Sequence, residues 1–187
     1  MTSGGIVSLE RECGYRAFSQ ERDNFRQRYQ AASKMLFSSI TFVWQEYLDD
    51  EQFESLILDL LNREPGVTWA RKVGRASASD GGRDVIAEWY LDLAPWQEVT
   101  EQRAVARKRI IVQCKAYKDS INLSKLPNIP VIVDFHNAHG YLLVVFPRVT
   151  PQVIDYMTTV SARHKFWADW WTQVEIEDRL RTNLDIA

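Results

Sequence analysis

The segment RIIVQCK at residues 109–115 decides the fold, because a β-prone apolar run leads directly into an amide, a thiol and an ammonium group. Side chains of an extended strand alternate between its two faces. Gln113 and Lys115 therefore project from one face, and Val112 and Cys114 from the other. A plain core strand would not carry such polar groups, so we expect a strand over residues 107–116 that also forms part of a functional site.

A second segment, SDGGRDVIA at residues 79–87, likewise joins charged residues to a β-prone run. If the strand that starts at Asp84 pairs beside the 107–116 strand, a carboxylate, an amide oxygen and an ammonium group converge. Oxygen ligands of this kind suit a hard divalent cation, Mg²⁺ or Mn²⁺. Phosphodiester hydrolysis needs such a cation because charge must be neutralised and water deprotonated. The two segments together therefore predict a nuclease site.

The chemistry of each candidate residue suggests its role. Asp84 is the best candidate for the essential metal ligand, while Gln113 offers a side-chain oxygen and Cys114 a backbone carbonyl. Lys115 is placed to position or activate the attacking water, or to stabilise charge on the phosphoryl oxygens. We expect these four residues to form the centre of the site.

Two further acids, Glu54 and Asp80, complete the candidate site. Glu54 lies at the border of the apolar stripe of a helix expected at residues 51–63, so it can face inward. There it could bind the metal directly, through water, or by orienting a ligand. A glutamate at such a border is more often a solvated charge or a salt-bridge partner. Asp80 would support the metal ligands or pin the glycine-rich loop that contains it.

The charge distribution allows a nucleic-acid partner although the whole chain is slightly acidic. The 187 residues carry a formal net charge of -2, but residues 103–118 contain six lysines and arginines and no acid. A local basic surface can engage phosphates whatever the sign of the whole protein. Arg75, Arg83 and Lys118 flank the expected site and are the candidate DNA-binding residues. The alternative is that these are ordinary solvated charges.

Several other classes of protein and site are disfavoured. Two cysteines are too few for a disulfide framework. The N-terminus has no secretory signal pattern and no apolar run approaches membrane-spanning length, so we expect a cytoplasmic protein without membrane contact. His136 and His139 lie three residues apart, but no cysteine or further histidine nearby completes a zinc site.

The order of the expected elements indicates an α/β fold with a mixed central sheet flanked by helices. The chain divides into an N-terminal helical extension at residues 1–48 and a nuclease domain at residues 49–187. A helical pattern covers residues 9–47, as one long helix or two shorter ones. The aromatic residues at 166–171 indicate packing of a terminal helix, with stacking on bases as the alternative. Helices are expected at 51–63, 131–137, 150–160 and 178–184, and strands at 67–73, 84–91, 107–116, 140–146 and 173–176. Residues 131–133 are β-branched, so a strand is the alternative there.

Three motifs together resemble the Mrr-like branch of the PD-(D/E)xK nucleases: FEsL at 53–56, SDGGRD at 79–84 and VQCK at 112–115. The resemblance covers the chain from about Asp50 onward. It implies a restriction-endonuclease-like fold and metal-dependent cleavage of double-stranded DNA, often in restriction or antiphage defence and sometimes as the effector domain of a larger protein. Gln113 replaces the third acid of the superfamily, a feature that Mrr-like enzymes share.

Two alternatives to the nuclease remain open. The chain could be a non-catalytic DNA-binding or oligomerisation module on a nuclease fold. Asp84 and Lys115 could instead be a structural ion pair across the sheet. If the chain is a nuclease, a homodimer or higher oligomer is plausible, because two sites are needed to break both strands together, and a sensor or regulatory partner could control it.

Overall fold

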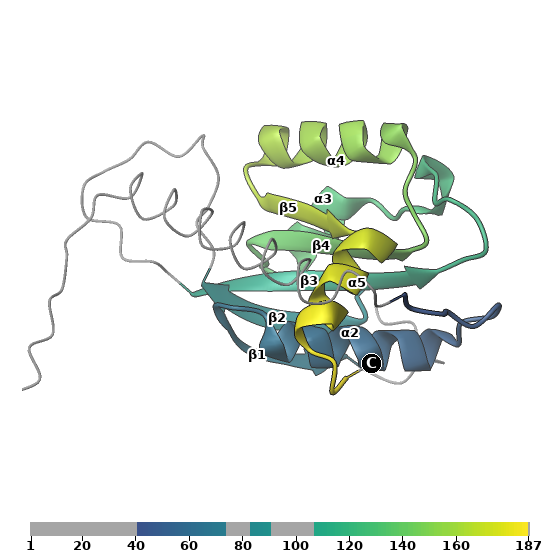
Figure 1. Cartoon of the computed structure of the whole chain (residues 1–187). Coiled ribbons are helices and arrows are strands. Elements are labelled where there is room, and N and C mark those ends of the chain that lie inside the picture. The colour runs from purple at the N-terminus through teal and green to yellow at the C-terminus, as the bar shows by residue number, and fades with distance from the viewer. Residues whose placement is uncertain (1–40, 74–82, 91–106, 187) are drawn as a thin grey trace, which may run out of the picture. The chain divides into compact units, whose positions relative to one another are not determined.

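The computed structural model describes residues 41–73, 83–90 and 107–186 (Figure 1). The chain divides into two units, residues 1–38 and 39–187, and everything below concerns the second unit. The helical pattern expected at residues 9–40 lies outside the described residues. The boundary expected between residues 48 and 49 stays a prediction.

A five-stranded mixed sheet forms the centre of the second unit. Its strand order follows the sequence, with β1, β2 and β3 antiparallel and β3, β4 and β5 parallel. The predicted mixed sheet is therefore confirmed. The strands are β1 (Val67–Lys72), β2 (Val85–Tyr90), β3 (Arg107–Ala116), β4 (Gly140–Phe146) and β5 (Trp167–Trp171).

Helices cover both faces of the sheet, as Figure 1 shows. The helix α2 starts at Asp50, within one residue of the predicted start, because the Asp49 carboxylate accepts a hydrogen bond of 3.0 Å from the Gln52 N–H. The helices α2 and α5 pack on one face, and α3 and α4 on the other. They are α2 (Asp50–Arg63), α3 (Ile129–Phe135), α4 (Pro151–His164) and α5 (Gln173–Thr182), with a short 3₁₀ helix at Leu123–Lys125.

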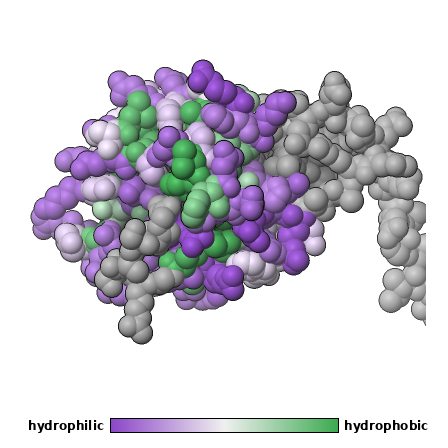
Figure 2. All heavy atoms as spheres, turned by 180° about the vertical axis from the view of Figure 1, so that it is seen from behind, coloured by the Kyte–Doolittle hydropathy of each residue, from purple (hydrophilic) through white to green (hydrophobic). Residues whose placement is uncertain are grey.

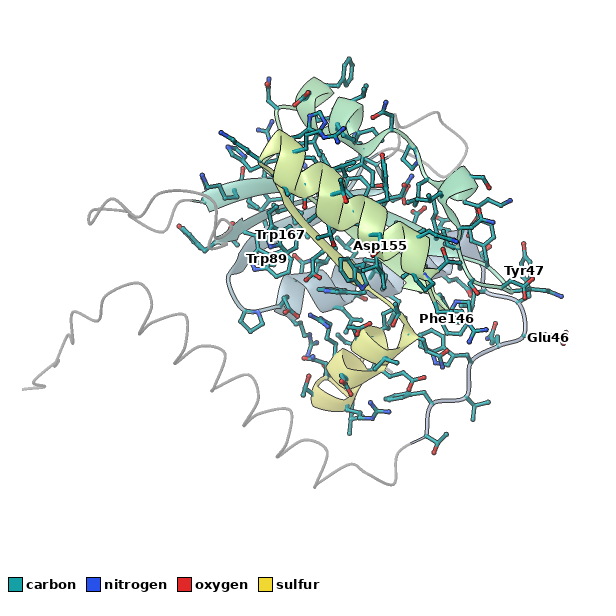
Figure 3. The ribbon with its side chains drawn as sticks, turned by 90° about the horizontal axis from the view of Figure 1, so that it is seen from above. Glu46, Tyr47, Trp89, Phe146, Asp155 and Trp167 are labelled. Carbon is teal, nitrogen blue, oxygen red and sulfur yellow. The ribbon has the colours of Figure 1, made fainter. Side chains whose placement is uncertain are left out.

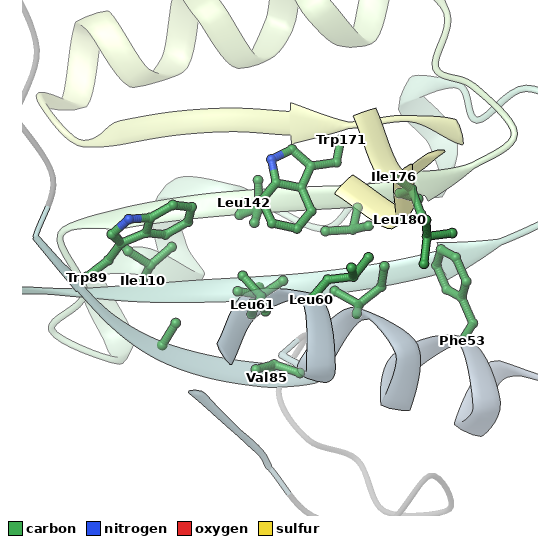
Figure 4. Packing of buried hydrophobic residues seen from close by; sticks show 14 residues of the cluster. Phe53, Leu60, Leu61, Val85, Trp89, Ile110, Leu142, Trp171, Ile176 and Leu180 are labelled. Atoms are coloured by element: carbon green, nitrogen blue, oxygen red, sulfur yellow. The ribbon is translucent and has the colours of Figure 1, made fainter. Parts of the chain in front are cut away.

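Alternating strand residues supply the two cores. Val85, Val112 and Leu142 face α2 and α5, where they pack with Leu60 and Trp171 (Figure 4). Ile111 and its neighbours on β4 face α3 and α4. Each fully buried aliphatic side chain contributes about 1.5–3 kcal/mol, so the two cores fix the register of β3 and β4. The polar residues at the end of β3 are thereby held on defined faces.

Residues 41–47 are not helical, which corrects the prediction for this part of the chain. Phe42 and Trp44 are partly buried while Val43 is 93% exposed, the alternation of an extended segment. Tertiary contacts decide the conformation. The Trp44 ring lies 4.6 Å from that of Phe146, and its indole N–H donates to Glu177 Oε1 at 2.8 Å.

The last strand and helix also differ from the prediction. Residues 173–176, expected to be a strand, form the first turn of α5, and the strand is the tryptophan-rich segment before it. Thr172 and Glu175 form a capping box that starts the helix there. The aromatic residues therefore belong to a strand and not to a terminal helix. One of them, Trp167, packs against Trp89 with ring centroids 5.7 Å apart (Figure 3).

Candidate active site

Asp84 lies at a bend directly before β2. Its N–H donates to the Val112 carbonyl of β3 at 3.0 Å, whereas its carbonyl accepts from the Val73 N–H at 2.9 Å. In a regular strand both groups would face the same neighbour, so the backbone turns at this residue. The turn directs the carboxylate to β3, where Oδ2 accepts the Cys114 N–H at 2.5 Å. A charge-assisted hydrogen bond of this kind fixes the carboxylate against the end of β3.

Gln113 lies beside Asp84 and faces the core under α3 and α4. Val85 pairs with Val112 in the antiparallel ladder. The residue before Val85, Asp84, therefore lies opposite the residue after Val112, Gln113. The Tyr141 hydroxyl donates to Gln113 Oε1 at 2.6 Å, and Gln113 is 7% exposed. Lys115, two residues on, lies by alternation on the same face and is partly buried.

Cys114 packs on the opposite face, against the core under α2 and α5. Burial raises the pKa of its thiol well above the usual value, the negative charges of Asp84 and Glu54 raise it further, and Lys72 and Lys115 oppose them. Four charged groups therefore lie within electrostatic reach of one sulfur. Its N–H points to Asp84, and the carbonyl of a strand residue points to the same neighbour as its N–H. The Cys114 carbonyl is thus directed to the side where Asp84 lies.

Tyr141 is a residue of the site that sequence reasoning missed. Burial raises the pKa of its hydroxyl well above the usual value, and the Asp84 charge adds to that shift. The neutral hydroxyl is the donor that orients the Gln113 amide. A tyrosine in the aliphatic run YLLVVF at 141–146 was the only local signal, because its hydroxyl needs a partner when buried.

Glu54 reaches this region from α2, on the other face of the sheet from Gln113. Its carboxylate pairs with Lys72 Nζ at 3.1 Å, and the two side chains are 16% and 25% exposed. Lys72 also donates to the Ser55 hydroxyl at 3.3 Å. The salt-bridge partner that the sequence left as the alternative for Glu54 is therefore present, close to the site.

The predicted DNA-binding residues and Asp80 are described only in part. Arg83 is half-buried, and its Nη1 lies 2.8 Å from His136 Nδ1. Lys118 is exposed just beyond the end of β3. Arg75 and Asp80 lie outside the described residues.

The oxygen atoms near Asp84 fit a magnesium ion that keeps much of its water. Within the described ranges no group of three His, Cys, Asp or Glu side chains could hold a metal. A cation would therefore depend on the Asp84 carboxylate, the Gln113 side-chain oxygen and the Cys114 carbonyl. Gln113 Oε1 accepts one bond from Tyr141 and has a second lone pair. Mg²⁺ is commonly bound by one or two carboxylates, with waters completing its octahedron.

Comparisons with known proteins found a family model and a solved structure that are similar to this chain. Residues 46–167 match the Mrr_cat family model, which describes a restriction endonuclease. The solved structure of the DNA modification-dependent restriction endonuclease AspBHI is similar, with a TM-score of 0.44 and 16% sequence identity. The similarity covers 84% of this chain and 35% of that one. A search of curated proteins gave no match. In the part of the chain that the structure describes, every helix is too short or too polar to cross a membrane.

Proposed function

The chain belongs to the Mrr_cat restriction endonuclease family, and on this basis we propose that it is a Mg²⁺-dependent endonuclease acting on double-stranded DNA. One observation carries the proposal. The Asp84 carboxylate is held against β3 by the Cys114 N–H, beside Gln113 and close to Lys115. A carboxylate, neutral oxygens and a lysine are thus gathered at the end of two paired strands.

The charge of each group determines the role that we propose for it in catalysis. Mg²⁺ or Mn²⁺, when bound, supplies positive charge and lowers the pKa of a bound water. Asp84, Gln113 and the Cys114 carbonyl would hold it. Lys115 positions the attacking water and neutralises negative charge that develops on the phosphoryl oxygens. Glu54, already paired with Lys72, would act through a water or by orienting a ligand.

The contacts with DNA are proposed for the basic residues around this centre. Arg83 directly precedes Asp84, and Lys118 follows the end of β3 and is exposed. Guanidinium and ammonium groups so placed engage the phosphate backbone without reading its sequence. Arg75 is proposed for the same role from its position in the sequence.

The wider role is proposed from the family. We place the chain in restriction or antiphage defence in the cytoplasm, either alone or as the effector domain of a larger protein under a sensor or regulatory partner. Two copies would act together on double-stranded DNA, because one site breaks one phosphodiester bond at a time.

Cleavage of a supercoiled plasmid tests the proposal. We expect nicking by the wild type with Mg²⁺ or Mn²⁺ and none with EDTA. Lys115→Ala should lower the rate by about a thousandfold, as is typical when a positioned electrostatic group is lost. The control is Arg63→Ala, an exposed arginine on α2. If the wild type binds DNA but cleaves it with neither metal, the non-catalytic module replaces the nuclease.

A further inference from the structure

Two arginines meet at His136, at the carboxyl end of α3. Arg83 Nη1 lies 2.8 Å from the ring Nδ1, and Arg109 Nη1 donates to the His136 carbonyl at 3.4 Å. An arginine can only donate, so Nδ1 is the acceptor and the neutral imidazole carries its proton on Nε2. One residue thus holds a guanidinium from β3 and another from the segment that leads into β2.

The two positive charges lack a carboxylate partner in the part of the chain that the structure describes. The ion pairs in that part of the chain are all made by other lysines and arginines. Arg83 Nε is in addition buried without a hydrogen-bond partner. Bringing two guanidinium groups close together is unfavourable, because like charges repel, and a buried donor without an acceptor also costs free energy. The arrangement calls for an anion.

The cluster is open to a macromolecule and adjoins the hydrolytic site. Arg109 is exposed, and Phe135, whose ring centroid lies 4.8 Å from that of His136, is 79% exposed. In Figure 1 α3 lies behind the sheet, and the face seen from behind is largely hydrophilic around a group of hydrophobic residues (Figure 2). By alternation Arg109 shares its face of β3 with Gln113, four residues and about 13 Å along the strand.

We propose that Arg83, Arg109 and His136 form a binding site for a DNA backbone phosphate on the same side of the sheet as the one that is hydrolysed. The proposal rests on the proposed function and adds a second phosphate contact to it. The two guanidinium groups bind the phosphate, as arginine does in paired hydrogen bonds. His136 is a positioning residue that holds both arginines in place through its ring and its carbonyl.

A purely structural role is the competing explanation. Arg109 bonds a carbonyl at the end of α3, where a cation complements the helix dipole. In that case removal of Arg109 would lower the melting temperature and leave DNA binding unaffected. The salt dependence of DNA affinity separates the two roles, because each phosphate contact contributes about 0.9 to the slope of log affinity against log salt.

The experiment measures binding of the full chain to a short DNA duplex in EDTA, where no cleavage is expected, over a series of salt concentrations. Arg83→Ala and Arg109→Ala should each weaken binding and reduce the slope by up to about one. His136→Ala should weaken binding by about tenfold, and His136→Asn, which keeps an acceptor oxygen, should restore most of it. Arg63→Ala on the other face removes the same charge and should leave the slope unchanged.

Unchanged slopes in both arginine variants would overturn the phosphate site. If Arg109→Ala unfolds, Arg83→Ala decides alone, because Arg83 contacts the ring of His136 and not a carbonyl of the helix end. The result is independent of the nuclease test. Reduced slopes with a wild type that does not cleave would support the phosphate site and reject the nuclease, whereas unchanged slopes with an active wild type would reject the phosphate site only.

Discussion

The two faces of the sheet differ in how a partly buried arginine is paired. Under α2 and α5, Glu64 is 8% exposed and accepts two hydrogen bonds from Arg179, at 2.9 and 3.2 Å. That guanidinium also lies 3.7 Å from the centre of the Trp171 ring. On the α3 side Arg83 meets a neutral imidazole and leaves its Nε without a partner. The first arrangement pairs a cation with an anion, while the second has no carboxylate partner in the described part of the chain.

This difference distinguishes charges that form structural ion pairs from charges that we propose bind a ligand. A matched, buried pair gives little net stability but is costly to break from one side. An unmatched cation near the proposed catalytic carboxylate would cost stability in the free protein and is expected where a substrate supplies the missing charge. Substitutions should therefore affect unfolding on one face and DNA cleavage or binding on the other.

Asp84→Asn gives the largest expected effect and tests the site most directly. The amide oxygen can still accept the Cys114 N–H, but the negative charge is lost. Cleavage should fall by about a thousandfold or more, because the cation loses its only carboxylate among the proposed ligands. The melting temperature should change little. Plasmid cleavage and thermal unfolding on the same preparations make the measurement.

Two results would contradict a catalytic role for Asp84 and with it the contrast between the two faces of the sheet. Cleavage by Asp84→Asn at the wild-type rate would show that the carboxylate has no catalytic role. A large loss of stability together with the loss of cleavage would show that Asp84 is structural. Asp155→Asn is a suitable control. Asp155 is exposed on α4, and neither proposal gives its carboxylate a role.

Glu64→Gln should give the second effect, on stability and not on activity. It removes the negative charge of the Glu64–Arg179 pair and leaves the guanidinium without a charged partner. Loss of one side of a buried pair costs about 3–5 kcal/mol, and the lower end applies because Arg179 is 20% exposed. Urea unfolding measures the loss, while the cleavage rate at saturating DNA should stay at the wild-type value.

The exposed pair beside it is the matched control. Arg63 and Asp185 are 45% and 62% exposed, and Arg63→Ala should cost less than about 1 kcal/mol. Equal losses in Glu64→Gln and Arg63→Ala would mean that burial does not distinguish these pairs, and the contrast between the two faces would lose its basis.

Local patterns predicted the mixed sheet and which residues of its strands share a face, and distant contacts decided the rest. Strand alternation placed Gln113 and Lys115 on one face, and the apolar pattern placed α2 to within one residue of its start. The helix predicted for residues 41–47 was wrong because their conformation is fixed by contacts with Phe146 and α5, far along the chain. The partners of Gln113 and Arg83, Tyr141 and His136, lie 28 and 53 residues away, and no spacing rule connects them.

His139 should give the smallest effect, and it reports the positive potential on the α3 side. Burial lowers the pKa of its ring below 6.5, and Lys108 and Arg109 lower it further. The folded protein therefore binds fewer protons than the unfolded chain as pH falls from about 7 to 5, so the stability associated with His139 decreases with falling pH. His139→Gln removes this titration. The melting temperature of the wild type should fall relative to this variant over that range.

The same measurement in Arg109→Ala extends the argument. Without the guanidinium one of the two named cations is gone, so the acid sensitivity due to His139 should become smaller. The Arg109 N–H also donates to His139 Nδ1 at 3.3 Å, a bond that a protonated Nδ1 cannot accept and that Arg109→Ala keeps. An acid sensitivity that is identical with and without the Arg109 side chain would assign the shift to burial, to Lys108 and to the retained N–H bond, and not to the guanidinium. A reduced one would show that unmatched positive charge is felt at this end of the sheet, where the proposed phosphate would neutralise it.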